Sequence, residues 1–326
     1  MKIEIIAELG INHNGDIDLC RRMIDELSLI GVDAVKFQIV SKELNYNLPE
    51  GSPLYPFFKQ SDLGVEGYKL MSDYCRKKGI KPYSSIADVC GVDTFMQADF
   101  DLVKLSSSNL TNRPLHSKIL RLKKPVIFST GSGTLEEIVN TSNFFSSNNV
   151  QHSVLHCISE YPAPFDKLNL AVIPFLKEIL KIDVGFSDHS KGSLAGALAI
   201  QKGATILEKH FTLDHGLDGP DHKFSLDIEE MKSYVDSVRL AENSVGDSHK
   251  YFVDKVAQND LIKRAIVLTR DFSRGEIVRE GDIVVARPNT IIAGSIHPFE
   301  YENIIGKKVS KSVKKWDSLT WSHFLE

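Results

Sequence analysis

The sequence predicts an α/β fold, a (β/α)₈ barrel (TIM barrel) followed by a small β-rich domain. Short runs rich in β-branched residues alternate with longer segments of helical spacing, which is typical of a parallel sheet covered by helices. Eight such strands, with the helical segments between them, occupy about 245 residues, the usual size of this barrel. A doubly wound sheet is disfavoured because no Gly-x-Gly-x-x-Gly follows the first predicted strand.

The elements of the barrel follow from apolar periodicity and from capping residues. Asp16 is a good N-cap for the first helix, and Gly31 is a good residue to end it. Helices are predicted at residues 17–30, 63–78, 113–121, 135–145, 170–180, 193–202 and 228–244. Strands are predicted at residues 3–7, 34–37, 81–84, 102–105, 125–128, 153–156, 183–186 and 205–208.

The last quarter of the chain has a different pattern. Short apolar runs at residues 265–268 and 283–285 are separated by turn signals such as Arg274-Gly275. We therefore expect a barrel domain at residues 1–246, a polar linker at 247–262 and a small β-rich domain at 263–326. From Lys263 onward there are 11 Lys and Arg against 8 Asp and Glu, so this basic tail could dock on the acidic remainder of its own or another copy.

Composition excludes several classes of protein. Of 326 residues, 42% are hydrophobic and 25% charged, as in ordinary globular proteins. No apolar run reaches the roughly 18 residues that a membrane span needs, and the four scattered cysteines suggest no disulfide framework. A net charge of −4 argues against a nucleic-acid partner. We expect a cytoplasmic protein with no membrane partner.

Polar residues end every predicted strand, and this pattern predicts an active site. A barrel of this kind carries its active site where the carboxyl ends of the strands meet. One serine there is usually a helix cap, but polar ends on all eight strands are hard to explain by packing. They are Glu8; Lys36 and Gln38; Ser84 and Ser85; Lys104 with Ser106 to Ser108; Ser129; His156, Cys157 and Ser159; Ser187, Asp188 and His189; and Glu208, Lys209 and His210.

Two histidines form a candidate metal site. His189 and His210 end neighbouring strands, whose backbones lie about 4.8 Å apart, so both imidazoles can reach one ion. Two histidines without cysteine leave room for carboxylate, water and substrate oxygens, as in an open catalytic site. Mixed N and O ligands favour Mn²⁺, with Co²⁺, Zn²⁺, Fe²⁺ and Mg²⁺ as alternatives. The plainer interpretation is that both rings only hold the barrel mouth by hydrogen bonds.

Two lysines predict a site for a small polyanion. Lys36 and Lys104 would place their ammonium groups in the barrel mouth, beside the hydroxyls of Ser107, Ser129 and Ser187. A phosphorylated carboxylic acid fits this set. The alternative is that the lysines pair with Glu8 or Glu208.

The last predicted strand is followed by a long loop, residues 212–223, which contains Gly219-Pro220-Asp221-His222. A long loop at the catalytic face is more often functional than connective. Asp221 could act as a base or orient a substrate, although simple turn chemistry explains the same residues.

Taken together, these motifs resemble the sialic acid synthases, the N-acetylneuraminate synthase family that forms nonulosonic acids. The tail resembles the antifreeze-like (SAF) domain of that family, so the resemblance covers the whole chain. The matching segments are Ala7-Glu8-Leu9-Gly10-Ile11-Asn12-His13-Asn14-Gly15, Asp33-Ala34-Val35-Lys36-Phe37-Gln38, Ser129-Thr130-Gly131, Ser187-Asp188-His189, Glu208-Lys209-His210-Phe211-Thr212-Leu213 and Gly219-Pro220-Asp221-His222.

The resemblance implies a metal-dependent condensation of phosphoenolpyruvate with an N-acylated hexosamine, giving a nine-carbon 2-keto sugar acid and phosphate. It implies a domain-swapped homodimer in which Arg287 reaches the partner's active site. Its functional positions fall on the following residues: Glu8 and Asp221 as catalytic groups; His189 and His210 as metal ligands; Lys36, Lys104, Ser107, Ser129, Ser159 and Ser187 at phosphoenolpyruvate; and Gln38, Tyr161 and Arg287 at the sugar.

The sequence departs from the family pattern at four places. Ser159 replaces a common Asn, Ser132 replaces Met, Asn289 replaces Gly after Arg287-Pro288, and Ser85-Ile86-Ala87 replaces Thr-Pro-Phe. These changes leave the lysines and histidines intact, so they leave open the acceptor sugar, N-acetylmannosamine or a di-N-acylated deoxyhexose. The alternatives are a Schiff-base aldolase using Lys104, a metal-dependent hydrolase and a non-catalytic sugar-binding protein.

Overall fold

The computed structural model describes residues 2–39, 53, 55–246, 264–289 and 294–325. The chain forms two compact units, Met1–Gly246 and Asp247–Glu326. The expected linker at residues 247–262 lies outside the described residues. No helix in the described ranges combines the length and the apolar character that crossing a membrane requires.

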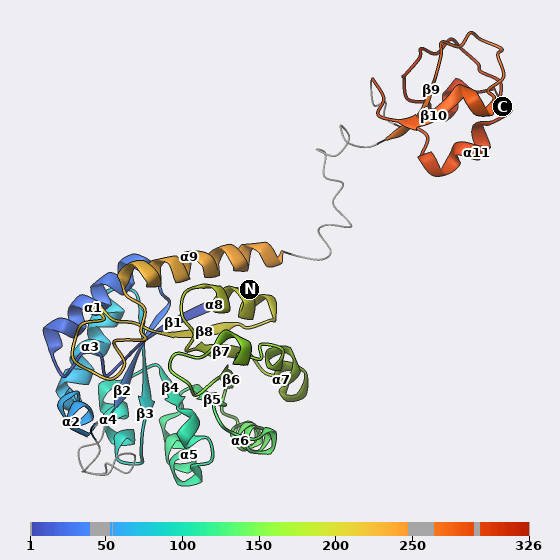
Figure 1. Ribbon diagram of the computed structural model, residues 1–326. Helices are drawn as coiled ribbons and strands as arrows, with labels where there is room; N and C mark the ends of the chain where they lie inside the picture. Colours follow the sequence, from blue (N-terminus) through green and yellow to red (C-terminus); the bar gives the residue numbers. More distant parts are fainter. Residues whose placement is uncertain (1, 40–52, 54, 247–263, 290–293, 326) are drawn as a thin grey trace. The chain divides into compact units, whose positions relative to one another are not determined.

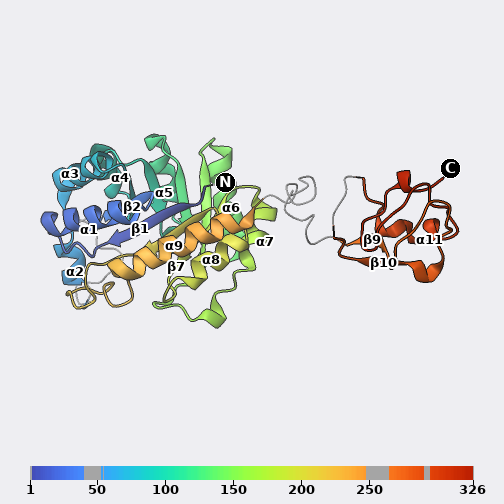
Figure 2. The same cartoon turned by 90° about the horizontal axis from the view of Figure 1, so that it is seen from above.

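The first unit is a closed barrel of parallel strands surrounded by helices, as the sequence predicts (Figures 1 and 2). Each strand is hydrogen-bonded to the next in chain order, and the last is hydrogen-bonded to the first. The strands are β1 (Glu4–Gly10), β2 (Ala34–Ile39), β3 (Lys81–Ile86), β4 (Leu102–Leu105), β5 (Val126–Ser129), β6 (His152–Cys157), β7 (Val184–Asp188) and β8 (Ile206–His210).

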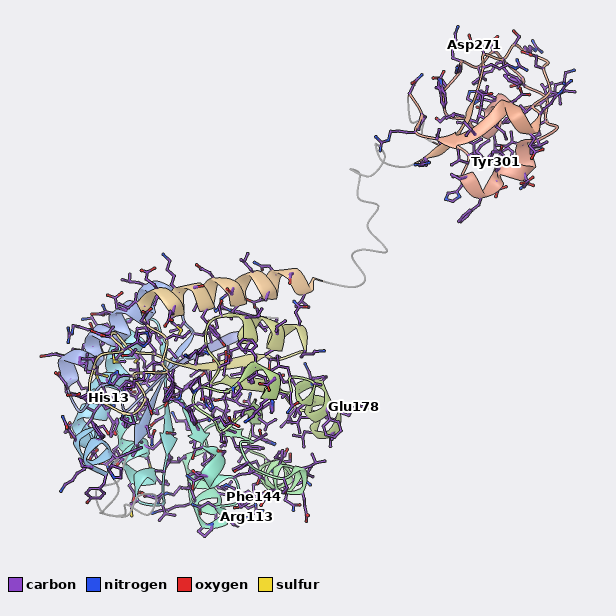
Figure 3. All side chains as sticks on the ribbon, viewed as in Figure 1. His13, Arg113, Phe144, Glu178, Asp271 and Tyr301 are labelled. Atoms are coloured by element: carbon purple, nitrogen blue, oxygen red, sulfur yellow. The ribbon has the colours of Figure 1, made fainter. Side chains whose placement is uncertain are left out.

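All seven predicted helices are present, with bounds close to those expected. The carboxylate of Asp16 accepts hydrogen bonds from Asp18 N and Leu19 N, and Gly31 ends the first helix at φ 89°. Between neighbouring helices, the Arg113 guanidinium lies 4.2 Å from the ring centre of Phe144 (Figure 3). The helices are α1 (Ile17–Ile30), α2 (Tyr55–Gln60), α3 (Gly64–Lys77), α4 (Gly91–Ala98), α5 (Arg113–Ile119), α6 (Leu135–Ser147), α7 (Val172–Leu180), α8 (Leu194–Gln201) and α9 (Ile228–Val245).

Two of these helices, α2 and α4, were not predicted. Both are short, and α4 has no side-chain cap at its N-cap residue, Cys90. Instead Asp88, two residues earlier, accepts hydrogen bonds from the amides of Cys90 and Gly91. A short helix without a standard cap gives little periodic signal.

Several strands extend further toward their carboxyl ends than predicted. β1 reaches Gly10 instead of residue 7, and β8 reaches His210 instead of residue 208. A polar side chain does not interrupt the backbone ladder when it points into the barrel mouth. The polar residues at these ends therefore belong to the strands themselves and are held by the ladder.

The barrel interior follows the two-residue period of the strands. One apolar layer inside the barrel consists of Ile6, Ala34, Tyr83, Leu102, Ile127, Leu155 and Ile206. The residues two positions later on the same strands form the next layer, and all of them except Cys157 are polar: Glu8, Lys36, Ser85, Lys104, Ser129, Cys157 and Glu208. The residues between them face outward and pack against the helices in the larger core.

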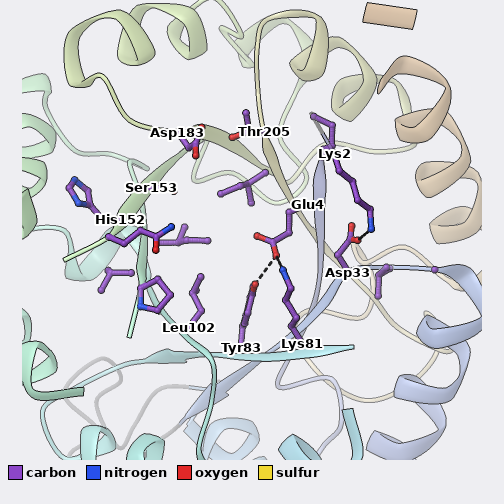
Figure 4. A pocket seen from close by; sticks show the side chains of 18 of the residues that line it. Lys2, Glu4, Asp33, Lys81, Tyr83, Leu102, His152, Ser153, Asp183 and Thr205 are labelled. Carbon is purple, nitrogen blue, oxygen red and sulfur yellow. Dashed lines mark hydrogen bonds and ion pairs between the residues drawn. The ribbon is translucent and has the colours of Figure 1, made fainter. Parts of the chain in front are cut away.

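The opposite, amino end of the barrel has a cavity of about 750 Å³ (Figure 4). Four of its charged groups form two ion pairs. Lys81 Nζ lies 2.7 Å from Glu4 Oε1, which also accepts a 2.7 Å hydrogen bond from Tyr83. Lys2 Nζ lies 2.5 Å from Asp33. Because this end of such barrels serves stability, we assign these pairs to stability and not to chemistry.

The second unit is small and β-rich, as predicted. Strand β9 (Ala265–Leu268) pairs antiparallel with β10 (Ile283–Ala286), and one short helix, α11 (Tyr301–Ile304), follows. It has its own apolar core, which includes Ile266, Phe272 and Leu319. Arg287 is exposed and directly follows β10.

Candidate active site

A buried cluster of lysines and carboxylates lies at the carboxyl ends of β1, β2, β4 and β8. Lys36 Nζ lies 2.8 Å from Glu8 Oε2 and 2.8 Å from Glu208 Oε2. Lys104 Nζ lies 3.5 Å from Glu208 Oε1 and donates a 2.7 Å hydrogen bond to Ser129 Oγ. Glu208 therefore bridges both lysines, so the pairing that the sequence left as an alternative is present.

The electrostatics of this cluster follow from burial and pairing. Burial lowers the pKa of Lys36 to about 8, although the charge of Glu208 opposes this shift. Burial alone would raise the pKa of the Glu208 carboxyl, yet Lys104 and Lys36 hold it well below its usual range. Two ammonium and two carboxylate groups balance each other, so an incoming polyanion needs further positive charge nearby.

His189 is oriented by its backbone surroundings. Its Nδ1 lies 2.7 Å from Ile158 O, which can only accept, so the ring proton sits on Nδ1 and Nε2 carries a lone pair. Ser187 Oγ lies 3.2 Å from this Nε2 but donates its one proton to Glu208 Oε1 at 2.7 Å. The lone pair of His189 Nε2 is therefore available to a cation.

His210 faces the same space from β8. Its Nδ1 is buried and has no hydrogen-bond partner, which leaves a second nitrogen available. The two imidazole centres are 5.8 Å apart. Burial and the neighbouring His189 hold the pKa of His210 well below its usual range, so this ring is neutral, as a metal ligand must be. An unsatisfied buried nitrogen beside a free lone pair fits a divalent cation.

The barrel mouth supplies two histidines but no complete set of protein ligands. In the described part of the chain, three possible ligands converge within 4.8 Å elsewhere, at His215, Asp227 and Glu230. His215 Nε2 lies 3.5 Å from Asp227 and 3.3 Å from Glu230, at the exposed start of α9. This group was not predicted from the sequence; in the structure Asp227 and Glu230 also form the capping box of α9.

An aromatic wall borders the two histidines. The ring centre of Tyr161 lies 4.1 Å from that of His189, and Phe224 lies 5.1 Å from His210 and 4.9 Å from Tyr161. Tyr161 is 51% exposed, so it forms part of the accessible mouth. Phe224 was not predicted; its position directly after the long loop was the available signal.

Asp221 lies between the metal candidates and the first strand. Its carboxylate is 4.0 Å from His210 Nδ1. A Cβ built on Gly10 would lie 3.1 Å from Glu8 and 3.5 Å from Asp221, so the two carboxylates flank this glycine. Burial raises the pKa of Asp221 to about 6, a value suited to proton transfer near neutral pH.

The loops after β4, β5 and β6 bring small hydroxyl residues together. Gly131 adopts φ 46°, and a Cβ there would lie 2.1 Å from Ser107 Cβ and 2.9 Å from Ser159 Oγ. Gly131 N donates to Cys157 Sγ at 3.1 Å. Only glycine fits between these serines, so the backbone closely approaches both of them.

The structure thus gathers the predicted barrel residues at one mouth, with differences in detail. Gln38 lies on the inward face of β2 and is half-buried. Arg287 belongs to the second unit. His156 points outward and bonds Leu168 O at 2.7 Å, so its place at a strand end was misleading. Glu208 was named only as a possible partner, although it is central.

Comparisons with known proteins agree with this picture. Residues 23–250 match the NeuB family, and residues 263–325 match the SAF domain. The chain is 35% identical to an N,N'-diacetyllegionaminic acid synthase from Legionella pneumophila, over 98% of this chain and 94% of that protein. It is 32% identical to a pseudaminic acid synthase from Campylobacter jejuni, over 99% and 97%.

A solved structure is similar as well. The crystal structure of an N-acetylneuraminic acid (sialic acid) synthetase from Leptospira borgpetersenii, in complex with citrate, superposes with a TM-score of 0.72. It is 29% identical, and the match covers 79% of this chain and 89% of that one.

Proposed function

The chain belongs to the NeuB family of nonulosonic acid synthases, enzymes that condense phosphoenolpyruvate with a sugar, and it ends in a SAF domain; on this premise we propose that its acceptor is an N-acylated hexosamine. The products are then a nine-carbon 2-keto sugar acid and phosphate. Family membership disfavours the Schiff-base aldolase, the metal-dependent hydrolase and the non-catalytic sugar-binding protein.

The proposal rests on one observation. Two imidazole nitrogens that are available to a cation lie in the same buried mouth as a pair of lysines. Enzymes of this family are metal-dependent. His189 and His210 would hold the ion, with Mn²⁺ the best match and Co²⁺, Zn²⁺, Fe²⁺ and Mg²⁺ as alternatives. A bound divalent cation supplies Lewis-acid polarisation of the sugar aldehyde.

Phosphoenolpyruvate would bind over the lysine cluster. Lys36 and Lys104 would hold its phosphate and carboxylate groups, and the hydroxyls of Ser107, Ser129, Ser159 and Ser187 would add hydrogen bonds. The lysines are already balanced by Glu8 and Glu208, so binding needs the metal ion and a further cation. We propose that Arg287 of the SAF domain supplies this cation.

The reaction would run between two carboxylates. C3 of phosphoenolpyruvate attacks the aldehyde carbon, which leaves positive charge at C2, and water then adds at C2 before phosphate departs with C–O cleavage. Glu8 would position the aldehyde end and the attacking water, and Asp221 would accept the proton that this water loses, while the former aldehyde oxygen takes up a proton to become a hydroxyl group. Gln38 and Tyr161 would orient the sugar.

The acceptor is proposed at the level of a class. Legionaminic and pseudaminic acid synthases are both relatives at 32–35% identity. Ser159, beside Gly131 and Ser107, adds a small polar side chain to the mouth, which suits an acyl amide. We propose a di-N-acylated deoxyhexose as the first candidate and N-acetylmannosamine as the second.

We further propose that residues 1–246 form the catalytic domain and that residues 263–326 complete the site of a second copy in a domain-swapped homodimer. The basic tail and acidic barrel support such docking. We also propose a cytoplasmic location, because phosphoenolpyruvate is available there, and no nucleic acid or membrane partner.

The test is phosphate release from phosphoenolpyruvate with a panel of N-acylated hexosamines, with and without a chelator. We expect release that depends on both sugar and metal. If no sugar in the panel elicits release with any divalent metal, the proposal fails.

A further inference from the structure

An ion pair that no proposed chemistry uses lies directly behind the two histidines. Asp188 and Lys209 face each other as the last paired residues of the β7–β8 ladder. Lys209 Nζ lies 3.1 Å from Asp188 Oδ2, and the two side chains are 2% and 0% exposed. Both point away from the barrel mouth, toward Tyr234 of α9. His189 and His210 are the next residues along these two strands, and they point into the mouth.

One ion pair and several hydrogen bonds hold these two side chains. Lys209 Nζ donates to Asp188 and to Ser190 O, and it lies 5.4 Å from the ring centre of Tyr234. Asp188 Oδ1 accepts from Ser190 N at 2.8 Å and from Ser190 Oγ at 2.6 Å. The residues before and after His189 are therefore fixed by one network.

The backbone of His189 is held from the other side as well. Its carbonyl accepts a 2.9 Å hydrogen bond from Ala163 N, and its ring donates to Ile158 O. Together with the Asp188–Lys209 pair, these bonds leave His189 little freedom to turn. His210 is restrained in the same way, because Lys209 is its immediate neighbour in β8.

Stability alone does not explain the pair. Replacing a buried ion pair by apolar residues of similar volume is often neutral or stabilising, because two charges must lose their water. A pair at the end of a ladder does fix register, and a slip of one residue would turn both histidines out of the mouth. The location of the pair therefore points to a role in geometry.

We propose that Asp188 and Lys209 are positioning residues: their buried ion pair fixes the spacing and direction of His189 and His210 and so sets the affinity of the metal site. The inference rests on the proposed function only for the identity of the two ligands.

The test uses the full chain, stripped of metal and titrated with Mn²⁺ alone, with free Mn²⁺ followed by electron paramagnetic resonance. Lys209→Met and Asp188→Asn should each weaken Mn²⁺ binding by roughly 10- to 100-fold, the usual effect of losing a partner behind a metal ligand. Turnover should fall, while saturating Mn²⁺ should restore part of it and leave KM for phosphoenolpyruvate unchanged. Asp188→Asn keeps the size and the turn, so it decides the question if Lys209→Met does not fold.

The matched control is Asp33→Asn at the other end of the barrel, where Asp33 accepts from Arg239 at 2.6 Å and from Ile5 N at 3.0 Å. It should lower the melting temperature and leave Mn²⁺ affinity unchanged. A folded Asp188→Asn variant with the Mn²⁺ affinity of the wild type overturns this inference alone. A wild type that binds no Mn²⁺, or binds it equally well after His210→Ala, contradicts the proposed function instead.

Discussion

Lys36 and Glu208 form a buried ion pair, with Nζ and Oε2 2.8 Å apart, although their strands are separated by most of the barrel sequence. Because Lys104 also relies on Glu208, we expect Glu208→Gln to lower the free energy of unfolding by about 3 kcal/mol, as for other buried pairs that lose one partner. Urea unfolding of the variant measures this. Glu4→Gln is a suitable control, since Glu4 pairs with Lys81 at the more exposed end of the barrel; an equal or larger loss in that control would contradict the prediction.

The pKa of Lys36 predicts how activity depends on pH. Burial lowers this pKa to about 8, so Lys36 is charged below pH 8 and loses its proton as the pH rises through that value. We expect kcat/KM for phosphoenolpyruvate to fall by about tenfold per pH unit above pH 8, because this parameter reports the free enzyme. Lys36→Arg, which stays charged, should remove that alkaline limb whatever its effect on the maximum rate. An alkaline limb that persists unchanged in Lys36→Arg would assign it to another group.

Loss of a proposed metal ligand should abolish turnover without unfolding the barrel. His210→Ala removes a side chain whose Nδ1 makes no hydrogen bond, so little stability depends on it. Activity should fall by more than roughly 100-fold, which is the loss expected when a residue that only supports a metal ligand is removed. Phosphate release and circular dichroism give the two readings, and a folded, fully active variant would remove the metal assignment.

Gly131 tests the close approach of backbone to serine. Gly131→Ala places a methyl group 2.1 Å from Ser107 Cβ, so Ser107 must move out of place. We expect kcat/KM to fall by more than about 100-fold, since small displacements of binding groups have effects of this size. Gly79→Ala controls for backbone strain, because Gly79 also has a positive φ, 78°, but nothing lies within 4 Å of the added carbon. Similar activity loss in both variants would exclude the proposed cause.

Mixing two inactive variants tests the swapped dimer. His210→Ala disables the barrel, and Arg287→Ala disables the small domain that we propose reaches across. In a swapped dimer, one of the two sites of each mixed dimer combines an intact barrel with an intact arginine. About half of the dimers in a reassembled equal mixture are mixed, so the mixture should recover about one quarter of wild-type activity. The measurement is phosphate release before and after reassembly. No recovery, with mixed dimers demonstrated, would mean that each small domain serves its own barrel.

Much of the fold was predictable because the barrel repeats one simple unit. The bounds of α1 were predicted from Asp16 and Gly31, since both caps act locally. The helix α4 was missed because its first amides are satisfied by Asp88, outside the usual cap position. Strand ends were placed too early, since polarity was taken to mark the end of a strand that in fact continues into the mouth.

The site was predictable to the level of which residues meet, but not how they interact. Counting two residues on from Ile206 identifies Glu208 as inward-facing, yet its bridging of Lys36 and Lys104 depends on barrel closure between distant strands. The outward direction of His156 was predictable in the same way, because successive residues of a strand point to opposite sides. In contrast, the tautomer of His189 depends on the carbonyl of Ile158, 31 residues away. Such relationships are tertiary and leave no local signal in the sequence.

Side chains alternate between inward and outward along each strand, so the two sets of positions are under different constraints during evolution. Most outward positions are apolar and keep the helices attached, whereas neighbouring inward positions near the mouth can change with little disturbance of that attachment. A barrel built in this way can exchange one acceptor sugar for another through a few substitutions. Related synthases with different products can therefore share a scaffold whose packing has hardly had to change.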